Sequence, residues 1–145
     1  MSLKDWLKNG WLVEHKTSRQ EITNLFGVAD RDLTDCRSPG LSEDWRMNIA
    51  YNAALQTATA ALAVCGYRAA REAHHYRIIQ SLVHTVGADA KLIGRFDQFR
   101  KKRNIGGYEQ AGLVSEQEAD EMIALSQQLR AQIYRWIQIN YPEFL

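Results

Sequence analysis

The sequence predicts an all-α protein, an antiparallel bundle of four to five helices formed by one domain that spans residues 1–145. Apolar residues recur at spacings of three and four in several segments, as they do on the buried face of a helix. Serine or aspartate precedes most of these segments and provides a helix cap. Only two prolines interrupt the chain, and no apolar–polar alternation is long enough to predict a strand.

Residues 1–17 are expected to form a short N-terminal extension with a brief helix that breaks around Gly10. The first long helix follows Ser18, which is placed to form a capping box with Glu21. This helix should end before the turn-forming residues 38–40. Its expected core residues are Ile22, Leu25, Phe26, Ala29 and Leu33.

An alanine-rich helix is predicted next, from Trp45 to Cys65, with Ser42 as its N-cap and Gly66 as its C-cap. Small residues along it allow neighbouring helices to approach closely. The residues expected to face the core are Trp45, Ile49, Ala53, Leu55, Thr59 and Leu62.

Three further helices complete the bundle. One is expected from His74 to Val86, closed by Gly87, with Ile78, Ile79, Leu82 and Val83 in the core. Asp89 caps the next, in which Leu92, Phe96, Phe99 and Arg103 share one face, and Gly106-Gly107 ends it. Ser115 and Glu118 form a second capping box before the last helix, which stops before Pro142. The last helix contributes the core candidates Met122, Ile123, Leu129, Ile133, Trp136 and Ile137.

Composition limits the possible functions and locations. Eighteen Lys and Arg against seventeen Asp and Glu give a net charge of +1, which excludes a polycation that coats DNA but allows a local basic patch. No apolar stretch approaches the roughly 20 residues that cross a bilayer, and the first residues do not resemble a signal peptide. We therefore expect a cytoplasmic protein without a membrane segment.

Motifs for metals, cofactors and common enzyme classes are absent from the sequence. Cys36 and Cys65 form no Cys-x-x-Cys pair, and without a secretory signal a disulfide is disfavoured. Neither His75 with Glu72 nor His84 with Asp89 completes a metal-ligand set. The chain has no phosphate-binding glycine loop, dinucleotide fingerprint or nucleophile elbow, and Glu14 and His15 are interpreted as isolated polar residues on the surface. No metal or cofactor is expected.

The most unusual segment is the cationic end of the fifth expected helix, residues 99–108. Arg100 to Arg103 are four consecutive cations, and Arg103 shares a face with two phenylalanines, which directs its guanidinium towards a partly buried surface. One interpretation is structural, because cations stabilise a helix C-terminus and arginine stems cover apolar neighbours. The other is that Arg100 and Arg103 bind phosphate, with Asn104 adding an amide and Tyr108 an aromatic face for a base.

This Arg-Asn pair at the end of the penultimate helix, followed by a short loop and a capped last helix, resembles HEPN domains. Residues 51–55, followed by an alanine-rich helix that ends in Gly66-Tyr67-Arg68, are similar to the central helix of that family. His74-His75 stands where many of its members carry a histidine. The likeness covers roughly residues 42–140.

The resemblance implies a helical bundle that dimerises. It also implies activity as a metal-independent ribonuclease, often a toxin with a nucleotidyltransferase antitoxin, or a non-catalytic role in nucleotide binding. The family's nuclease motif is Arg, a polar residue, a short gap and His. Arg103 and Asn104 match its start, but Tyr108 stands at the histidine position. A tyrosine with a pKa of about 10 exchanges protons poorly near neutral pH.

Another histidine could replace the missing one. Arg68 and His74 have the spacing of the motif but fall before the wrong helix. His74 and His75 could instead approach Arg103 in the folded bundle or across a dimer. The competing explanation is a histidine at a helix N-terminus that hydrogen-bonds the backbone.

Three functions remain open. The first is a catalytically weak or inactive module that binds RNA or a nucleotide through Arg100, Arg103, Asn104, Tyr108 and His75. The second is an active ribonuclease that uses Arg103 with His74 or His75. The third is a non-enzymatic dimeric subunit that pairs with a nucleotidyltransferase.

Overall fold

The computed structural model describes residues 1–106 and 112–145, which form a mostly helical molecule. Six α-helices and two short strands make up the described part, followed by a short 3-10 helix at Pro142–Phe144. The elements are α1 (Leu3–Lys8), β1 (Leu12–Glu14), α2 (Arg19–Asp35), α3 (Glu43–Val64), β2 (Tyr67–Ala69), α4 (His74–Ser81), α5 (Ala90–Gly106) and α6 (Glu116–Asn140).

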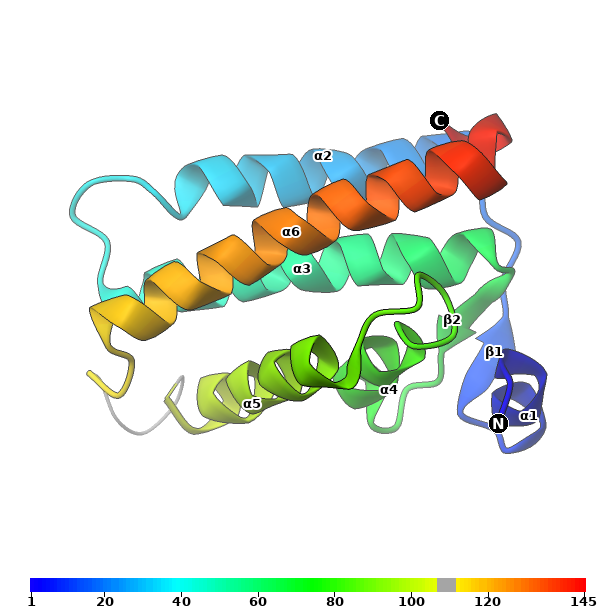
Figure 1. The fold of residues 1–145 in the computed structure, drawn as a ribbon, viewed down its shortest axis with the longest axis horizontal. Helices are drawn as coiled ribbons and strands as arrows, with labels where there is room; N and C mark the ends of the chain where they lie inside the picture. The colour runs from blue at the N-terminus through cyan, green and yellow to red at the C-terminus, as the bar shows by residue number, and fades with distance from the viewer. Residues whose placement is uncertain (107–111) are drawn as a thin grey trace.

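Helix α3 is the centre of the fold. It packs against α2 and α6, while α4 and α5 cover another of its sides (Figure 1). Helix α2 runs antiparallel to α3, but α6 runs in the same direction as α3, because α4 and α5 return the chain between them (Figure 1). A helical bundle is therefore confirmed, with six helices in the described residues, but the predicted antiparallel arrangement is wrong for α3 and α6.

Alanines allow α3 to occupy this central position. Ala50, Ala54, Ala58 and Ala61 are fully buried, so neighbouring helices approach the α3 backbone closely on several sides. Ser42 caps the helix by accepting a hydrogen bond from the Trp45 amide at 3.2 Å. The expectation that Trp45 itself faces the core was wrong. Trp45 is 62% exposed.

The other helix caps follow local sequence rules. Ser115 and Glu118 form the reciprocal capping box, and Asp89 accepts a hydrogen bond from the Leu92 amide at 2.7 Å. Ser18 caps α2, but the Glu21 side chain does not complete the box. It binds Thr17 and His15 instead.

A two-stranded antiparallel sheet departs from the all-α prediction. Strands β1 and β2 pair Leu12 with Ala69, Val13 with Arg68 and Glu14 with Tyr67. Each strand has only three residues, too few for an alternating pattern to be visible in the sequence. The sheet fixes residues 1–17 to the bundle, and Leu12 is 2% exposed.

Helix α4 is shorter than the segment from His74 to Val86 that the sequence predicted. It ends at Ser81, whose hydroxyl donates a hydrogen bond to the Ile78 carbonyl oxygen, and turns follow. The β-branched residues Val83, Thr85 and Val86 favour helix weakly, which explains the early end. Val83, expected in the core, is half exposed.

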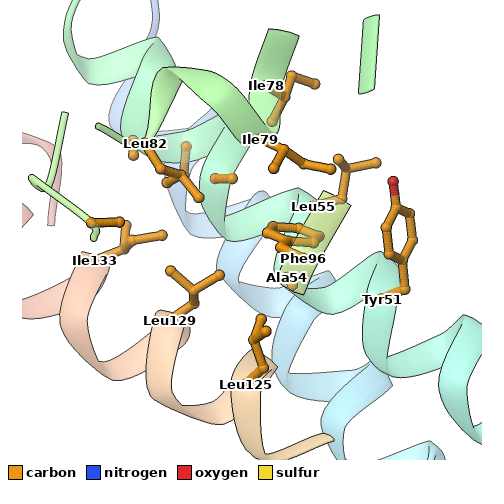
Figure 2. Packing of buried hydrophobic residues seen from close by; sticks show 14 of the residues in the cluster. Tyr51, Ala54, Leu55, Ile78, Ile79, Leu82, Phe96, Leu125, Leu129 and Ile133 are labelled. Atoms are coloured by element: carbon orange, nitrogen blue, oxygen red, sulfur yellow. The ribbon is translucent and has the colours of Figure 1, made fainter. Parts of the chain in front are cut away.

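The core beside α5 forms around Phe96. Figure 2 shows this ring among Leu55, Ile79 and Leu129, with Tyr51 at the edge of the cluster. Phe96 is fully buried, and its ring meets that of Tyr51 edge to face, with 5.5 Å between the centroids. This packing fixes where the cationic end of α5 meets α3. In the described part of the chain, no helix has the length and apolar character needed to cross a membrane.

Candidate phosphate-binding site

Arg103 does not extend into solvent but packs against the central helix. It lies in the last turns of α5, and its side chain is half-buried. The Cζ atom stands 5.2 Å from the centroid of the Tyr51 ring. This distance is within the range of a cation–π contact, so the aromatic face positions the guanidinium. The sequence-based inference that Arg103 points towards a partly buried surface is confirmed.

Tyr51 connects Arg103 to a histidine. Its hydroxyl oxygen lies 3.3 Å from Nδ1 of His75, the second residue of α4, and the two ring centroids are 6.0 Å apart. The Tyr51 ring is fully buried. One core residue therefore contacts both the cation and the imidazole. In the sequence, Tyr51 stands only in the stretch that resembles the central helix of a known family, and its role as a site residue becomes visible only in the tertiary packing.

Arg100 lies in the same cluster but already has a partner. Its Nε donates a hydrogen bond to Asp97 at 2.6 Å, and Asp97 is 8% exposed. The Arg100 Cζ also lies 5.4 Å from the ring centroid of Tyr76. Lys101 approaches the other Asp97 oxygen at 3.7 Å. Asp97 thus neutralises part of the positive charge at this end of α5, and Arg103 is better placed than Arg100 to bind an anion.

The cluster disfavours a charged His75. Burial lowers the pKa of His75 below its ordinary value, and the positive charges of Arg103, His74 and Arg100 lower it further. Burial also raises the pKa of Tyr51 well above that of a free phenol. At neutral pH the imidazole is therefore uncharged and the phenol keeps its proton, so the guanidinium groups provide the charge of the site.

His74 has a different environment from His75. Its Nδ1 donates hydrogen bonds to the carbonyl oxygens of Ala69 at 3.2 Å and Ala70 at 3.1 Å. His74 is thus a histidine at a helix N-terminus that hydrogen-bonds the backbone, the alternative that the sequence left open. The His74 and His75 rings remain neighbours, with 6.0 Å between their centroids. The structure thus places His75 beside the Tyr51–Arg103 pair and turns His74 towards β2.

Two other candidate residues cannot be placed in this cluster. Asn104 belongs to α5 by its backbone, but its side chain is outside the described part of the structure. Tyr108 lies outside the described residues altogether. Their proposed ligand contacts therefore stay predictions.

A second polar cluster shows that the interpretation as an isolated surface residue was wrong for His15, whereas Glu14 is exposed as expected. His15 lies with its Nε2 2.7 Å from a Glu21 carboxylate oxygen, which also accepts a hydrogen bond from Thr17 at 2.6 Å. Burial alone would raise the pKa of Glu21, but these two hydrogen bonds outweigh it and the pKa lies below the ordinary value. The network joins the segment before α2 to its first turn.

Metal ligands do not gather in the described residues. No group of three or more His, Cys, Asp or Glu side chains is arranged there to hold a metal ion. Cys36 and Cys65 are both free thiols, and burial raises the pKa of each. Cys36 is fully buried beneath the end of α2, and the half-buried Cys65 lies 3.8 Å from the Tyr141 hydroxyl.

The fold and the cluster define a mostly helical protein with two arginines and a histidine gathered around a buried tyrosine. No protein-family model, curated protein or solved structure matches the chain.

Proposed function

We propose that the protein is a HEPN-like helical module that binds RNA or a nucleotide through a phosphate group at Arg103. One observation carries the proposal. Arg103 is held over Tyr51, beside His75, and no carboxylate hydrogen-bonds to it among the described residues. A guanidinium in this position offers several donors in a fixed fork, which suits the oxygens of a phosphate.

Comparison with other arginines supports this choice. Arg46 hydrogen-bonds Asp120, Arg95 hydrogen-bonds Glu121, and Arg130 binds both oxygens of Asp30. These three arginines stabilise contacts between elements of the fold. Arg103 instead has an aromatic face behind it, and among the described residues it donates no side-chain hydrogen bond.

Weak or absent catalysis is part of the proposal. The sequence places Tyr108 where the family motif carries histidine, and a phenol is a poor proton carrier near neutral pH. Arg100 is paired with Asp97, and this pairing weakens its ability to stabilise a negative charge that develops during a reaction. Binding needs only Arg103 and its neighbours, whereas strong catalysis needs a placed acid and base.

A second candidate is favoured by the position and charge state of His75. An uncharged imidazole beside a guanidinium is suited to act as a general base for RNA cleavage without a metal. In that reaction His75 takes the proton of a ribose 2′-hydroxyl. The 2′-oxygen then attacks phosphorus, the bond to the 5′-oxygen breaks, and water protonates the leaving oxygen. Arg103 would stabilise the negative charge on the phosphate.

Fluorescence anisotropy with a labelled 12-nucleotide single-stranded RNA tests the proposal. Binding should weaken with salt, because phosphate contacts release counterions, and Arg103→Gln should weaken it by about tenfold. Arg135→Gln is the matched control, since Arg135 is exposed on α6. Equal binding by wild type and Arg103→Gln would refute the site.

A cleavage assay separates the two candidates. The same RNA is incubated with protein in the presence of a metal chelator, and products are resolved on a gel. Binding without cleavage supports the non-catalytic module. Cleavage that disappears in both Arg103→Gln and His75→Gln supports the ribonuclease, whereas cleavage that persists in His75→Gln excludes His75 as the base.

A further inference from the structure

A second basic site lies on the other side of the His74-His75 pair. The structure has a pocket of about 520 Å³ between the β-sheet and the start of α4. It is lined by Val13, Arg68, Ala69, Ala70, Arg71 and His74. Two of these six side chains are guanidinium groups, one is an imidazole and the remaining three are apolar, so no acidic side chain lines the pocket.

The two arginines of this pocket are available to a ligand. Arg68 occupies the middle of β2 and Arg71 the turn that follows, and both are exposed. Neither hydrogen-bonds a carboxylate among the residues that the structure describes. Glu72 is the adjacent acid in the chain and is itself exposed. Arg68 also lowers the pKa of Glu21, but that carboxylate is already engaged by Thr17 and His15.

The turn before α4 holds His74 against this pocket. Ala73 adopts a left-handed conformation with φ of 53°, which costs energy for a residue with a side chain and must be maintained by its surroundings. The hydrogen bonds that His74 Nδ1 donates to two backbone carbonyls provide this support and hold the imidazole beside the pocket. Helix α4 also begins without a side-chain cap, so its first amides remain donors at the positive end of the helix dipole.

The pocket is adjacent to the Arg103 site through consecutive residues. His74 belongs to the pocket and His75 contacts Tyr51, and their rings are 6.0 Å apart between centroids. Next to them Tyr76 is 36% exposed, and its ring faces Arg100. Two groups of cations therefore lie on either side of the first turn of α4, which also presents the exposed ring of Tyr76.

We propose that the pocket formed by Arg68, Arg71 and His74 binds a second phosphate of the same nucleic acid, and that the ligand is single-stranded RNA rather than a mononucleotide. This inference rests on the proposed function of Arg103. A mononucleotide monophosphate satisfies only one of the two basic groups. A single strand supplies consecutive phosphates, and its unpaired bases can stack on Tyr76, as bases do on aromatic side chains of single-strand binders.

The test compares two ligands and three variants of the full chain. The ligands are the labelled 12-nucleotide RNA, followed by anisotropy, and AMP, followed by calorimetry. The variants are Arg68→Gln/Arg71→Gln, Arg103→Gln, and Arg37→Gln/Arg135→Gln, a control that removes two exposed arginines on other elements. Thermal unfolding followed by circular dichroism establishes that each variant is folded, and Arg68→Gln and Arg71→Gln, tested singly, replace the pocket double variant if it is not.

The pocket double variant should bind the RNA about tenfold more weakly, with a salt slope smaller by about 1.4, the value for two lost contacts to a single strand. Its affinity for AMP should equal that of wild type. Arg103→Gln should weaken both ligands.

Unchanged RNA binding by the pocket variant, together with weak binding by Arg103→Gln, refutes the second subsite and leaves the proposed function intact. Loss of AMP binding in the pocket variant also refutes it, because the mononucleotide would then occupy the pocket. Absence of RNA binding by wild type refutes both proposals.

Discussion

The guanidinium of Arg103 lies over the ring of Tyr51, with 5.2 Å between Cζ and the centroid, while the hydroxyl of the same tyrosine lies 3.3 Å from Nδ1 of His75. Tyr51 is fully buried in α3, the helix around which the fold is built. The distance between the cation and the imidazole is thus controlled by the core, which makes the site sensitive to changes in packing.

Removing the Tyr51 hydroxyl should cost stability. Tyr51→Phe keeps the ring beneath Arg103 but leaves His75 Nδ1 without its partner, and we expect a loss of about 1 kcal/mol in the free energy of unfolding. Urea denaturation measures it. Tyr134→Phe is the control, because the Tyr134 hydroxyl makes no hydrogen bond among the described residues and its loss should have little effect. Equal stability of the two variants would contradict the contact.

Truncating Phe96 should disturb both the fold and the site. The ring is fully buried and packs edge to face on Tyr51, so Phe96→Ala should lower the free energy of unfolding by about 3–5 kcal/mol. Val83→Ala, at a half-exposed position, should change it by less than about 0.5 kcal/mol. If Phe96→Ala behaves like Val83→Ala in urea denaturation, the described packing is wrong.

Local chemistry made the helices predictable. Ser42, Asp89 and Ser115 cap the helices that follow them, because a capping hydrogen bond joins residues three apart and is visible in the sequence. The sheet was not predictable, since each strand has three residues and its partner lies far along the chain. Val83 was misplaced because α4 ends at Ser81, so helical spacing does not apply beyond it, and Trp45 because helical spacing gives a face but not the neighbours that cover it.

The candidate site was predictable only in part. The spacing of Arg103 from Phe96 and Phe99 indicated a partly buried guanidinium, and the structure bears this out. The choice between His74 and His75 depended on how α4 begins, which is determined by the left-handed Ala73 and the bonds of His74 to the backbone. Tyr51 could not be recognised, because its two contacts come from helices distant in sequence.

Stability should depend on pH through His75. Its pKa in the folded state lies below the value of about 6.5 of an unfolded histidine, so between the two values the unfolded chain binds more protons. The free energy of unfolding therefore falls as the pH drops below about 6.5 and levels off below the folded pKa. His75→Gln should show a smaller decrease between pH 7 and pH 5 in urea denaturation. Parallel curves for wild type and variant would contradict the burial of this imidazole.

Asp44 should anchor the segment that precedes α6. Its carboxylate accepts hydrogen bonds from the amides of Gly112 at 2.8 Å and Val114 at 3.3 Å. Asp44→Ala removes both and also an acidic residue from the first turn of α3, so a loss of about 1.5–3 kcal/mol in the free energy of unfolding is expected. Asp35→Ala, which removes an exposed acid at the end of α2, should not destabilise the protein. Hydrogen exchange should accelerate at Gly112 and Val114 in Asp44→Ala alone, and unchanged exchange there would exclude the anchor.

The joint position of Arg103 and His75 can be tested by nuclear magnetic resonance on protein labelled in its histidine rings, with AMP as the ligand. We predict that the ring signals of His75 shift on titration, and that Arg103→Gln abolishes the shift at the same AMP concentrations while the His84 signals stay in place. AMP binding that leaves His75 unmoved, or that shifts it equally in Arg103→Gln, would contradict a phosphate site built on this pair.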